Sequence, residues 1–258
     1  ISGAKNILVL ENYNGMAGDR NLAYDALTSN KSILKKISEI EEKIILLVAT
    51  GGGTTGSGTI PYIASLCTEL PDKIVCAALM IPRADEAIQK RLNAYNAAKE
   101  IMEIEDLGAT IFINNEADPN LDKINYNFVN MMDAFFKDDS ASSTSNFDDA
   151  EKIKMLSDHG AFVISMRTSK PEAQIETQDM VDSLTAKNIF LPINNDGIVA
   201  NIGIINQRGV DIDEHGIIRA VGTPENLFKG NNGTATIVCA SGLGFPVEYI
   251  GGLGKKAV

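Results

Sequence analysis

The chain has 258 residues, 44% of them hydrophobic, which fits one large globular domain or two modest ones. Its net charge of −11 argues against direct nucleic-acid binding, which needs clustered lysines and arginines, and no apolar run is long enough to span a membrane. The three cysteines have no metal-binding spacing and favour a reduced, cytoplasmic protein.

Strand-like and helix-like stretches alternate through the first half of the chain. Strands are expected at Ile7–Leu10, Ile44–Ala49, Ile74–Ile81 and Ala109–Ile113. Helices are expected between them at Leu22–Ile40, Pro61–Leu70 and Asp85–Ile104. This alternation predicts an α/β fold with a doubly wound parallel sheet, in which ligands bind at the carboxyl ends of the strands.

A glycine turn follows the first expected strand. Segment 14–20 reads Asn-Gly-Met-Ala-Gly-Asp-Arg. Its glycine N–H groups, together with Arg20, could meet a terminal phosphate. The alternative is a purely structural turn in which Asp19 caps the next helix, and the local sequence favours this alternative slightly.

A denser glycine motif follows the second expected strand. Segment 51–58 reads Gly-Gly-Gly-Thr-Thr-Gly-Ser-Gly, and Pro61 is expected to open the next helix. A strand, a glycine loop and a helix start together favour phosphate binding, because backbone N–H groups approach the oxygens closely and the helix N-terminus is partly positive. The motif has neither the lysine of a P-loop nor the spacing G-x-G-x-x-G. The alternative is a flexible turn.

Polar residues follow the third and fourth expected strands. Glu86 lies in a position from which a carboxylate can bind ribose hydroxyls, although it also suits the first turn of a helix. Asn115 follows the fourth strand, and Asn125 lies early in the next helix. An asparagine both donates and accepts, so the two can read the edge of guanine, whereas a plain turn would also explain Asn115.

The second half begins with a long central helix, Leu121–Lys137, whose broad apolar face suggests burial between two layers. A serine-rich linker, Asp138–Ser145, follows it. The remainder predicts a smaller α+β unit, with strands expected near 161–166, 198–206 and 235–240 and helices near 171–188 and 213–220. We therefore expect three parts: residues 1–120, the helix at 121–137, and residues 138–258.

An acidic motif follows the linker. Asn146, Asp148 and Glu151 lie in the sequence Asn-Phe-Asp-Asp-Ala-Glu. The pair Asp148 and Glu151 has the spacing of a capping box at the start of a helix, and on sequence alone this interpretation is favoured. The other interpretation is a pair of carboxylates that activate water, and one geometry can serve both.

Together these motifs resemble the tubulin/FtsZ family. Segment 52–58 is similar to the family's glycine signature loop, with Thr54 in place of one glycine. The motif at Asn146–Glu151 resembles its catalytic loop, and two α/β units joined by a central helix match its architecture. The segment 82–86 and Glu151 resemble the plasmid and phage TubZ-type branch. The family's first strand and first glycine loop have no counterpart in this sequence.

The resemblance implies binding of GTP and GDP, with Mg²⁺ held through the phosphates and by no direct protein ligand. Glu86 would bind ribose, Asn115 and Asn125 would read guanine, and Leu121 would lie against the base. The implied phosphate contacts are Gly15, Ala17, Gly18, Gly51, Gly52, Gly53, Thr54, Thr55, Gly56, Ser57 and Gly58.

The resemblance also implies a shared active site. The central helix is about 25 Å long, so Asn146, Asp148 and Glu151 cannot reach a nucleotide bound by their own chain. They would complete the site of the next subunit in a head-to-tail filament. The expected function is a filament-forming GTPase that segregates or positions DNA through a DNA-binding adaptor protein. The alternatives are a cell-division FtsZ-type ring protein and a non-polymerising nucleotide-binding regulator.

Overall fold

The computed structural model describes residues 6–10, 15–137, 147–169, 175–193 and 197–255. The helices in this part of the chain are α1 (Arg20–Ser29), α2 (Lys31–Ser38), α3 (Thr54–Thr68), α4 (Ile88–Met102), α5 (Leu121–Lys137), α6 (Asp149–Ser157), α7 (Thr177–Thr185), α8 (Glu214–Val221) and α9 (Val247–Leu253). The strands are β1 (Ile44–Thr50), β2 (Ile74–Ile81), β3 (Ala109–Asn114), β4 (Gly160–Arg167), β5 (Asn201–Gln207), β6 (Asn226–Gly233) and β7 (Thr236–Leu243).

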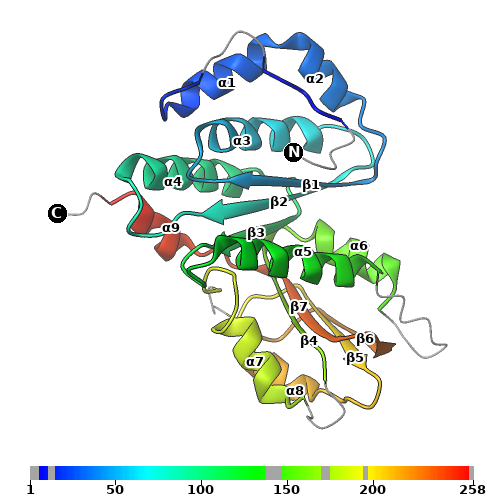
Figure 1. The fold of residues 1–258 in the computed structure, drawn as a ribbon. Coiled ribbons are helices and arrows are strands. Elements are labelled where there is room, and N and C mark those ends of the chain that lie inside the picture. The colour runs from blue at the N-terminus through cyan, green and yellow to red at the C-terminus, as the bar shows by residue number, and fades with distance from the viewer. Residues whose placement is uncertain (1–5, 11–14, 138–146, 170–174, 194–196, 256–258) are drawn as a thin grey trace.

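The strands form one mixed sheet in the order β1-β2-β3-β4-β7-β5-β6 (Figure 1). Strands β1 to β4 pair in parallel, as the alternation of strands and helices predicted. Strand β7 runs antiparallel to both of its neighbours, β4 and β5, so the sheet is mixed rather than wholly parallel. The α/β fold class is confirmed.

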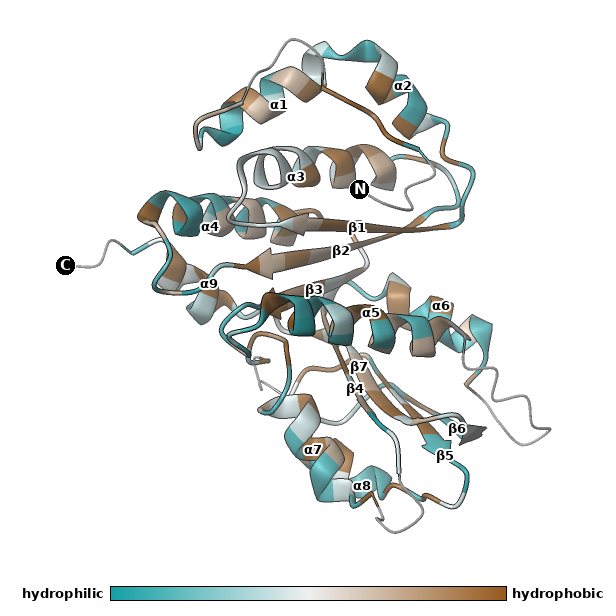
Figure 2. Ribbon diagram, in the orientation of Figure 1, coloured by the Kyte–Doolittle hydropathy of each residue, from teal (hydrophilic) through white to brown (hydrophobic). Residues whose placement is uncertain are grey.

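Two apolar clusters hold the fold together. One packs β1–β3 against α1–α4 and α9, and the other packs the opposite side of the sheet and its second half against α5–α8. Figure 2 shows the hydrophobic strands between these layers. Strands β2 and β3 are buried along most of their length, as the continuous apolar runs of a parallel sheet require. The central helix α5 has the predicted bounds and buries the stripe Ile124, Phe128, Met132 and Phe135.

The end of β3 leaves its neighbour β4. The two strands pair only at Ala109–Thr110 with Gly160–Ala161. Beyond that point the segment 189–191, which follows α7, runs beside β3. The Asn114 N–H donates to Ile189 O at 2.7 Å, and the Leu191 N–H donates to Phe112 O at 2.9 Å. The second half of the chain therefore contacts the carboxyl end of a strand from the first half.

Several expected elements differ from the structure. The strand expected at Ile7–Leu10 is absent: these residues have no regular structure, and the Ile7 and Val9 side chains are 62% and 67% exposed. The helix expected at Leu22–Ile40 is broken at Asn30, whose φ of −97° and ψ of 79° are not helical. The expectation that Pro61 opens a helix is wrong, because α3 begins at Thr54. Strand β6 and helix α9 were not expected.

None of the helices in the described residues is long and apolar enough to cross a membrane.

Candidate functional site

The carboxyl ends of β1, β2 and β3 meet at one edge of the sheet, where backbone hydrogen bonds join the loops that follow them. Gly51 N–H donates to Met80 O at 2.8 Å, and Asn115 N–H donates to Ile81 O at 3.2 Å. The Ala84 N–H donates to a carboxylate oxygen of Glu116 at 2.7 Å. The three loops therefore form one surface, at the edge where a parallel sheet places its ligands.

Helix α3 points its N-terminus at this edge. Gly53 is its N-cap residue and provides no side-chain cap. The N–H groups of Thr54, Thr55 and Gly56 make no hydrogen bond within the described residues, as expected for the first turn of a helix without a cap. Open N–H groups at the positive end of a helix dipole form a ready anion site.

Part of the segment 51–58, which was predicted to contact phosphate along its whole length, is used by the fold itself. The Gly51 N–H is used by the sheet, and Ser57 is fully buried, with its hydroxyl donating to Gly53 O and Thr54 O. A Cβ at Gly58 would overlap the backbone oxygen of Arg20, so this glycine allows two helices to approach closely. Only residues 52–56 are accessible to a ligand.

The glycine turn at 15–18 lies beside the first turn of α3. The Thr55 hydroxyl is 3.9 Å from the Met16 sulfur. Gly15, Ala17 and Gly18 all have positive φ, which strains Ala17 because it carries a Cβ. The Asn93 side chain on α4 donates to Gly18 O at 3.1 Å. Asp19 accepts from Asn21 N–H, which confirms the predicted helix cap.

Glu86, the predicted ribose ligand, is engaged by its own segment. One oxygen accepts from the Arg83 N–H at 3.0 Å, and the other pairs with Lys90 at 2.9 Å. Partial burial raises the pKa of Glu86, but the hydrogen bonds from Lys90 and Arg83 outweigh it and hold the pKa below its usual value. Ribose binding by Glu86 stays a prediction, and it would require Glu86 to share its carboxylate.

The predicted guanine-reading residues lie at the start of α5 and in the loop before it. Asn125 is exposed, and its neighbour one turn earlier, Leu121, is 43% exposed. The side chains of Asn115 and Asn125 make no hydrogen bond within the described part of the chain, so both remain available to a ligand. Asn114, which directly precedes Asn115, has a side chain that is already engaged: it accepts from the Glu116 N–H at 2.9 Å and from the Tyr249 hydroxyl at 3.5 Å.

The acidic motif caps helix α6. Asp148 Oδ1 accepts from the Ala150 N–H at 2.8 Å, and Glu151 Oε2 accepts from the Asp148 N–H at 2.9 Å, which confirms the capping box. The neighbouring Glu151 side chain, followed by the Ala150 N–H, lowers the pKa of Asp148. The next residue, Lys152, is buried with its ammonium 3.7 Å from Asp149. Asn146 lies outside the described residues.

The capping box and the glycine motif lie at opposite ends of α5 (Figure 1). Helix α5 has 17 residues, which corresponds to about 25 Å. The carboxylates of Asp148 and Glu151 are therefore not brought together with the first turn of α3 in one chain.

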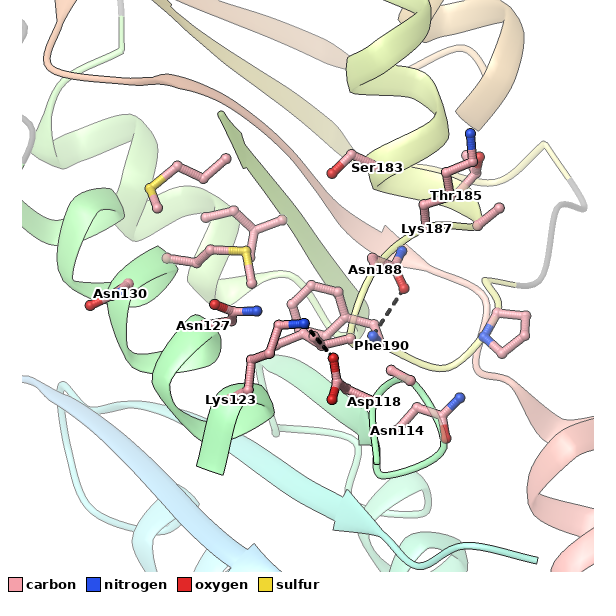
Figure 3. Close-up of a pocket in the computed structure, with 17 residues that line it drawn as sticks. Asn114, Asp118, Lys123, Asn127, Asn130, Ser183, Thr185, Lys187, Asn188 and Phe190 are labelled. Atoms are coloured by element: carbon pink, nitrogen blue, oxygen red, sulfur yellow. Dashed lines mark hydrogen bonds and ion pairs between the residues drawn. The ribbon is translucent and has the colours of Figure 1, made fainter. Parts of the chain in front are cut away.

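A pocket of about 830 Å³ lies between α5, the loop after β3 and the segment after α7 (Figure 3). Its wall includes the Lys123–Asp118 ion pair, at 2.5 Å, and the side chains of Asn127 and Asn188. The size is that of small-molecule sites. Sequence reasoning missed this pocket because its residues come from segments far apart in the chain. Within the described residues no group of three histidine, cysteine or acidic side chains could hold a metal ion.

Comparisons with known proteins give similar results for sequence and fold. Residues 4–121 match the tubulin/FtsZ family, GTPase domain. The chain is 29% identical over 216 residues to the tubulin-like protein TubZ of Clostridium botulinum C phage, and the match covers 82% of this chain and 58% of that protein. The chain thus spans less than two thirds of the length of this relative.

Solved structures show the same fold. The crystal structure of Clostridium botulinum phage c-st TubZ has a TM-score of 0.80 at 24% identity, covering 92% of this chain and 80% of that one. CetZ2 from Haloferax volcanii, solved as a GTPγS-bound protofilament, has a TM-score of 0.71 at 20% identity, covering 93% and 79%. Residues 4–121 are thus similar to the GTPase domain of the tubulin/FtsZ family, and the chain has a TubZ-like fold.

Proposed function

We propose that this protein is a GTPase that polymerises head to tail and completes each active site with residues from two subunits. The observation that carries the proposal is the uncapped N-terminus of α3 at the carboxyl edge of the sheet, with the Asp148–Glu151 box at the far end of α5. We also propose that the chain is organised in three parts: residues 1–120, the central helix at 121–137, and residues 138–258.

The nucleotide would lie across the edge formed by the three loops. The open N–H groups of residues 54–56 would hold phosphate oxygens, and the neighbouring turn at 15–18 would face the terminal phosphate. Asn115 and Asn125 would bind the guanine edge, with Leu121 against the base and Glu86 near the ribose. Mg²⁺ would neutralise phosphate charge when bound, and we propose that it is held through the phosphates.

Hydrolysis would use the carboxylates of the neighbouring subunit. A water aligned by Asp148 and Glu151 attacks the terminal phosphorus, the bond from that phosphorus to the bridging oxygen breaks, and the proton of the water passes to a carboxylate. The capping bonds use one oxygen of each carboxylate. Since a carboxylate has about four lone-pair sites, capping leaves capacity for the water. Asn146 would assist in the same loop.

This arrangement makes assembly a condition for turnover. A subunit that offers phosphate contacts at one end and carboxylates at the other forms a heterologous, head-to-tail interface. Each added subunit then leaves an unpaired surface for the next one, so a filament grows. Two relatives of the fold, CetZ2 and the TubZ of Bacillus thuringiensis serovar israelensis, were solved as protofilaments. A role in moving DNA through an adaptor protein would suit the acidic chain, which lacks the basic clusters that bind DNA directly.

Complementation tests the shared site. Thr55→Glu places a negative charge on the exposed first turn of α3, where it suits the helix dipole but repels phosphate. Asp148→Ala removes a carboxylate. Each variant alone should be inactive, and their mixture should hydrolyse GTP at interfaces that pair an intact first turn with intact carboxylates. Thr55→Gln is the matched control without the charge.

The mixture must also sediment as a joint filament in the presence of GTP. Co-sedimentation without recovered activity, together with wild-type activity independent of protein concentration, would overturn the shared site. GTP binding with no sedimentation at any concentration would instead favour the non-polymerising regulator.

A further inference from the structure

Pro61 lies in the interior of α3 and leaves one backbone carbonyl without its helical hydrogen bond. Pro61 has no N–H, so the Ser57 oxygen four residues earlier has no helical donor, and the proline ring crowds that oxygen. In this structure a side chain from another helix donates the missing hydrogen bond to this oxygen. The Arg20 Nη2 donates to Ser57 O at 2.7 Å.

The same guanidinium holds a third helix. Arg20 Nη1 and Nη2 each contact one carboxylate oxygen of Glu100 on α4, both at 2.6 Å. The Arg20 side chain is only 14% exposed, whereas that of Glu100 is 45% exposed. A planar guanidinium can bind a carboxylate with two donors and still reach a carbonyl, and a lysine ammonium cannot reproduce that geometry.

The backbone around Arg20 joins the same elements. Its own oxygen packs against Gly58 in the second turn of α3, where no Cβ would fit. Arg20 is also the first residue of α1, directly after Asp19 and the turn at 15–18. That turn is held from α4 by the bond between Asn93 and Gly18. Helices α1, α3 and α4 thus surround both glycine segments of the candidate site, and Arg20, on α1, contacts the other two helices.

We infer that Arg20 is a positioning residue for phosphate binding: by supplying the donor that Pro61 lacks, it fixes the first turn of α3 relative to the turn at 15–18. The inference rests on the proposed function. The Arg20 guanidinium is engaged by Glu100 and Ser57 O, so we assign it no direct contact with the nucleotide. It acts by keeping the N–H groups of residues 54–56 aimed at the edge of the sheet.

A double-mutant cycle with Pro61 tests this role. Pro61→Ala restores a helical N–H to Ser57 O, so the arginine is no longer needed at that carbonyl. Arg20→Met should weaken GDP affinity at least tenfold when Pro61 is present and no more than threefold when it is combined with Pro61→Ala. Affinity is measured by titration calorimetry with GDP and Mg²⁺, and corrected to the folded fraction determined by circular dichroism.

Two further variants separate positioning from mere folding. Glu100→Gln breaks the ion pair but keeps the Arg20–Ser57 bond, and should change GDP affinity by less than threefold. Arg20→Lys, which retains the charge and the packing stem, should fold and give an intermediate loss of affinity. It replaces Arg20→Met in the cycle if the methionine variant does not fold.

Equal losses of affinity with and without Pro61→Ala would overturn the inference, as would a loss of thermal stability with unchanged GDP affinity. GDP binding by the wild-type protein, and its loss in the Thr55→Glu variant, is the control. If both are seen, such a result contradicts the role of Arg20 and leaves the proposed function standing. Wild-type protein that binds no GDP would overturn both the inference and the proposed function.

Discussion

Glu151 and Asp148 are joined across the first turn of α6, where Glu151 Oε2 accepts a hydrogen bond from the Asp148 backbone N–H at 2.9 Å. The bond explains why the motif looks like an ordinary helix cap. It also fixes the Glu151 carboxylate in one orientation next to Asp148, as a pair of water-orienting groups requires. The two interpretations of the motif can therefore be separated only by substitutions that change one role at a time.

Glu151→Gln is such a substitution. A glutamine oxygen accepts the Asp148 N–H as a glutamate does, so the capping box survives. We expect stability within about 0.5 kcal/mol of wild type. GTP turnover should fall at least a hundredfold, since general base catalysis is worth about 10²–10⁴-fold. Phosphate release at fixed protein concentration, with urea denaturation alongside, measures both.

Glu151→Ala is the companion variant, because it removes the cap as well. It should lose about 1 kcal/mol of stability and be as inactive as Glu151→Gln. Turnover near the wild-type rate in Glu151→Gln, with a loss only in Glu151→Ala, would leave Glu151 as a cap and nothing more.

Asn125 should set the choice of base. Its side chain is exposed, so Asn125→Ala should change the free energy of unfolding by less than about 0.5 kcal/mol. We expect the wild-type protein to bind GTP at least tenfold more tightly than ATP, about 1.4 kcal/mol, and the variant to lose most of that preference. Competition titration gives the ratio. The guanine assignment fails if ATP and GTP compete equally for the wild-type protein.

Glu86 should contribute to acid sensitivity. Its folded pKa is lowered despite the opposing effect of burial, so its ion pair stabilises the protein above the unfolded pKa of about 4.3 and is lost as the pH falls through the folded value. In Glu86→Gln the unfolding free energy should therefore change less between about pH 5 and pH 3. Lys90→Met, which removes the partner, should flatten the curve in the same range. Curves parallel to wild type in both variants would exclude this contribution.

Gly58 should resist a substitution that ordinarily strengthens a helix. Alanine is favoured over glycine by up to about 1 kcal/mol inside helices. A Cβ at Gly58 would nonetheless overlap Arg20 O, so Gly58→Ala should destabilise the protein by roughly 1–3 kcal/mol. Gly252→Ala, at an exposed position of α9, meets nothing within 4 Å and should be neutral or stabilising. Thermal unfolding of the two variants measures the contrast. Equal changes in stability would mean that α1 can move away from α3 and accommodate the added methyl group.

The sequence predicts well those elements whose signal is local. Strands β1 to β3 are continuous apolar runs, and α5 carries a helical stripe from Ile124 to Phe135, so their positions follow from periodicity. Pro61 shows why other elements were missed. A proline is typical of a helix start, and the donor that lets it lie inside α3 comes from Arg20, far earlier in the chain, which no local pattern reports.

Pairing partners explain two further errors. Residues 7–10 have the composition of a strand but pair with no strand among the described residues. Strand β6 has a poor strand composition, and it forms because β5 pairs with it along its length. The sequence placed the candidate loops after β1, β2 and β3, where the structure has them, but it could not tell that Gly51, Ser57 and Gly58 are used by the fold. The roles of the remaining site residues stay predictions.

The segment 189–191 beside β3 also has a consequence for motion. The Asn114 amide hydrogen, next to the predicted base-reading loop, is protected by an oxygen from beyond α7, and the Leu191 amide by an oxygen of β3. Neither amide can exchange with solvent unless this junction opens. The loop that follows β3 and the segment 189–191 should therefore open together, so a nucleotide bound at this loop should slow exchange of the Leu191 amide.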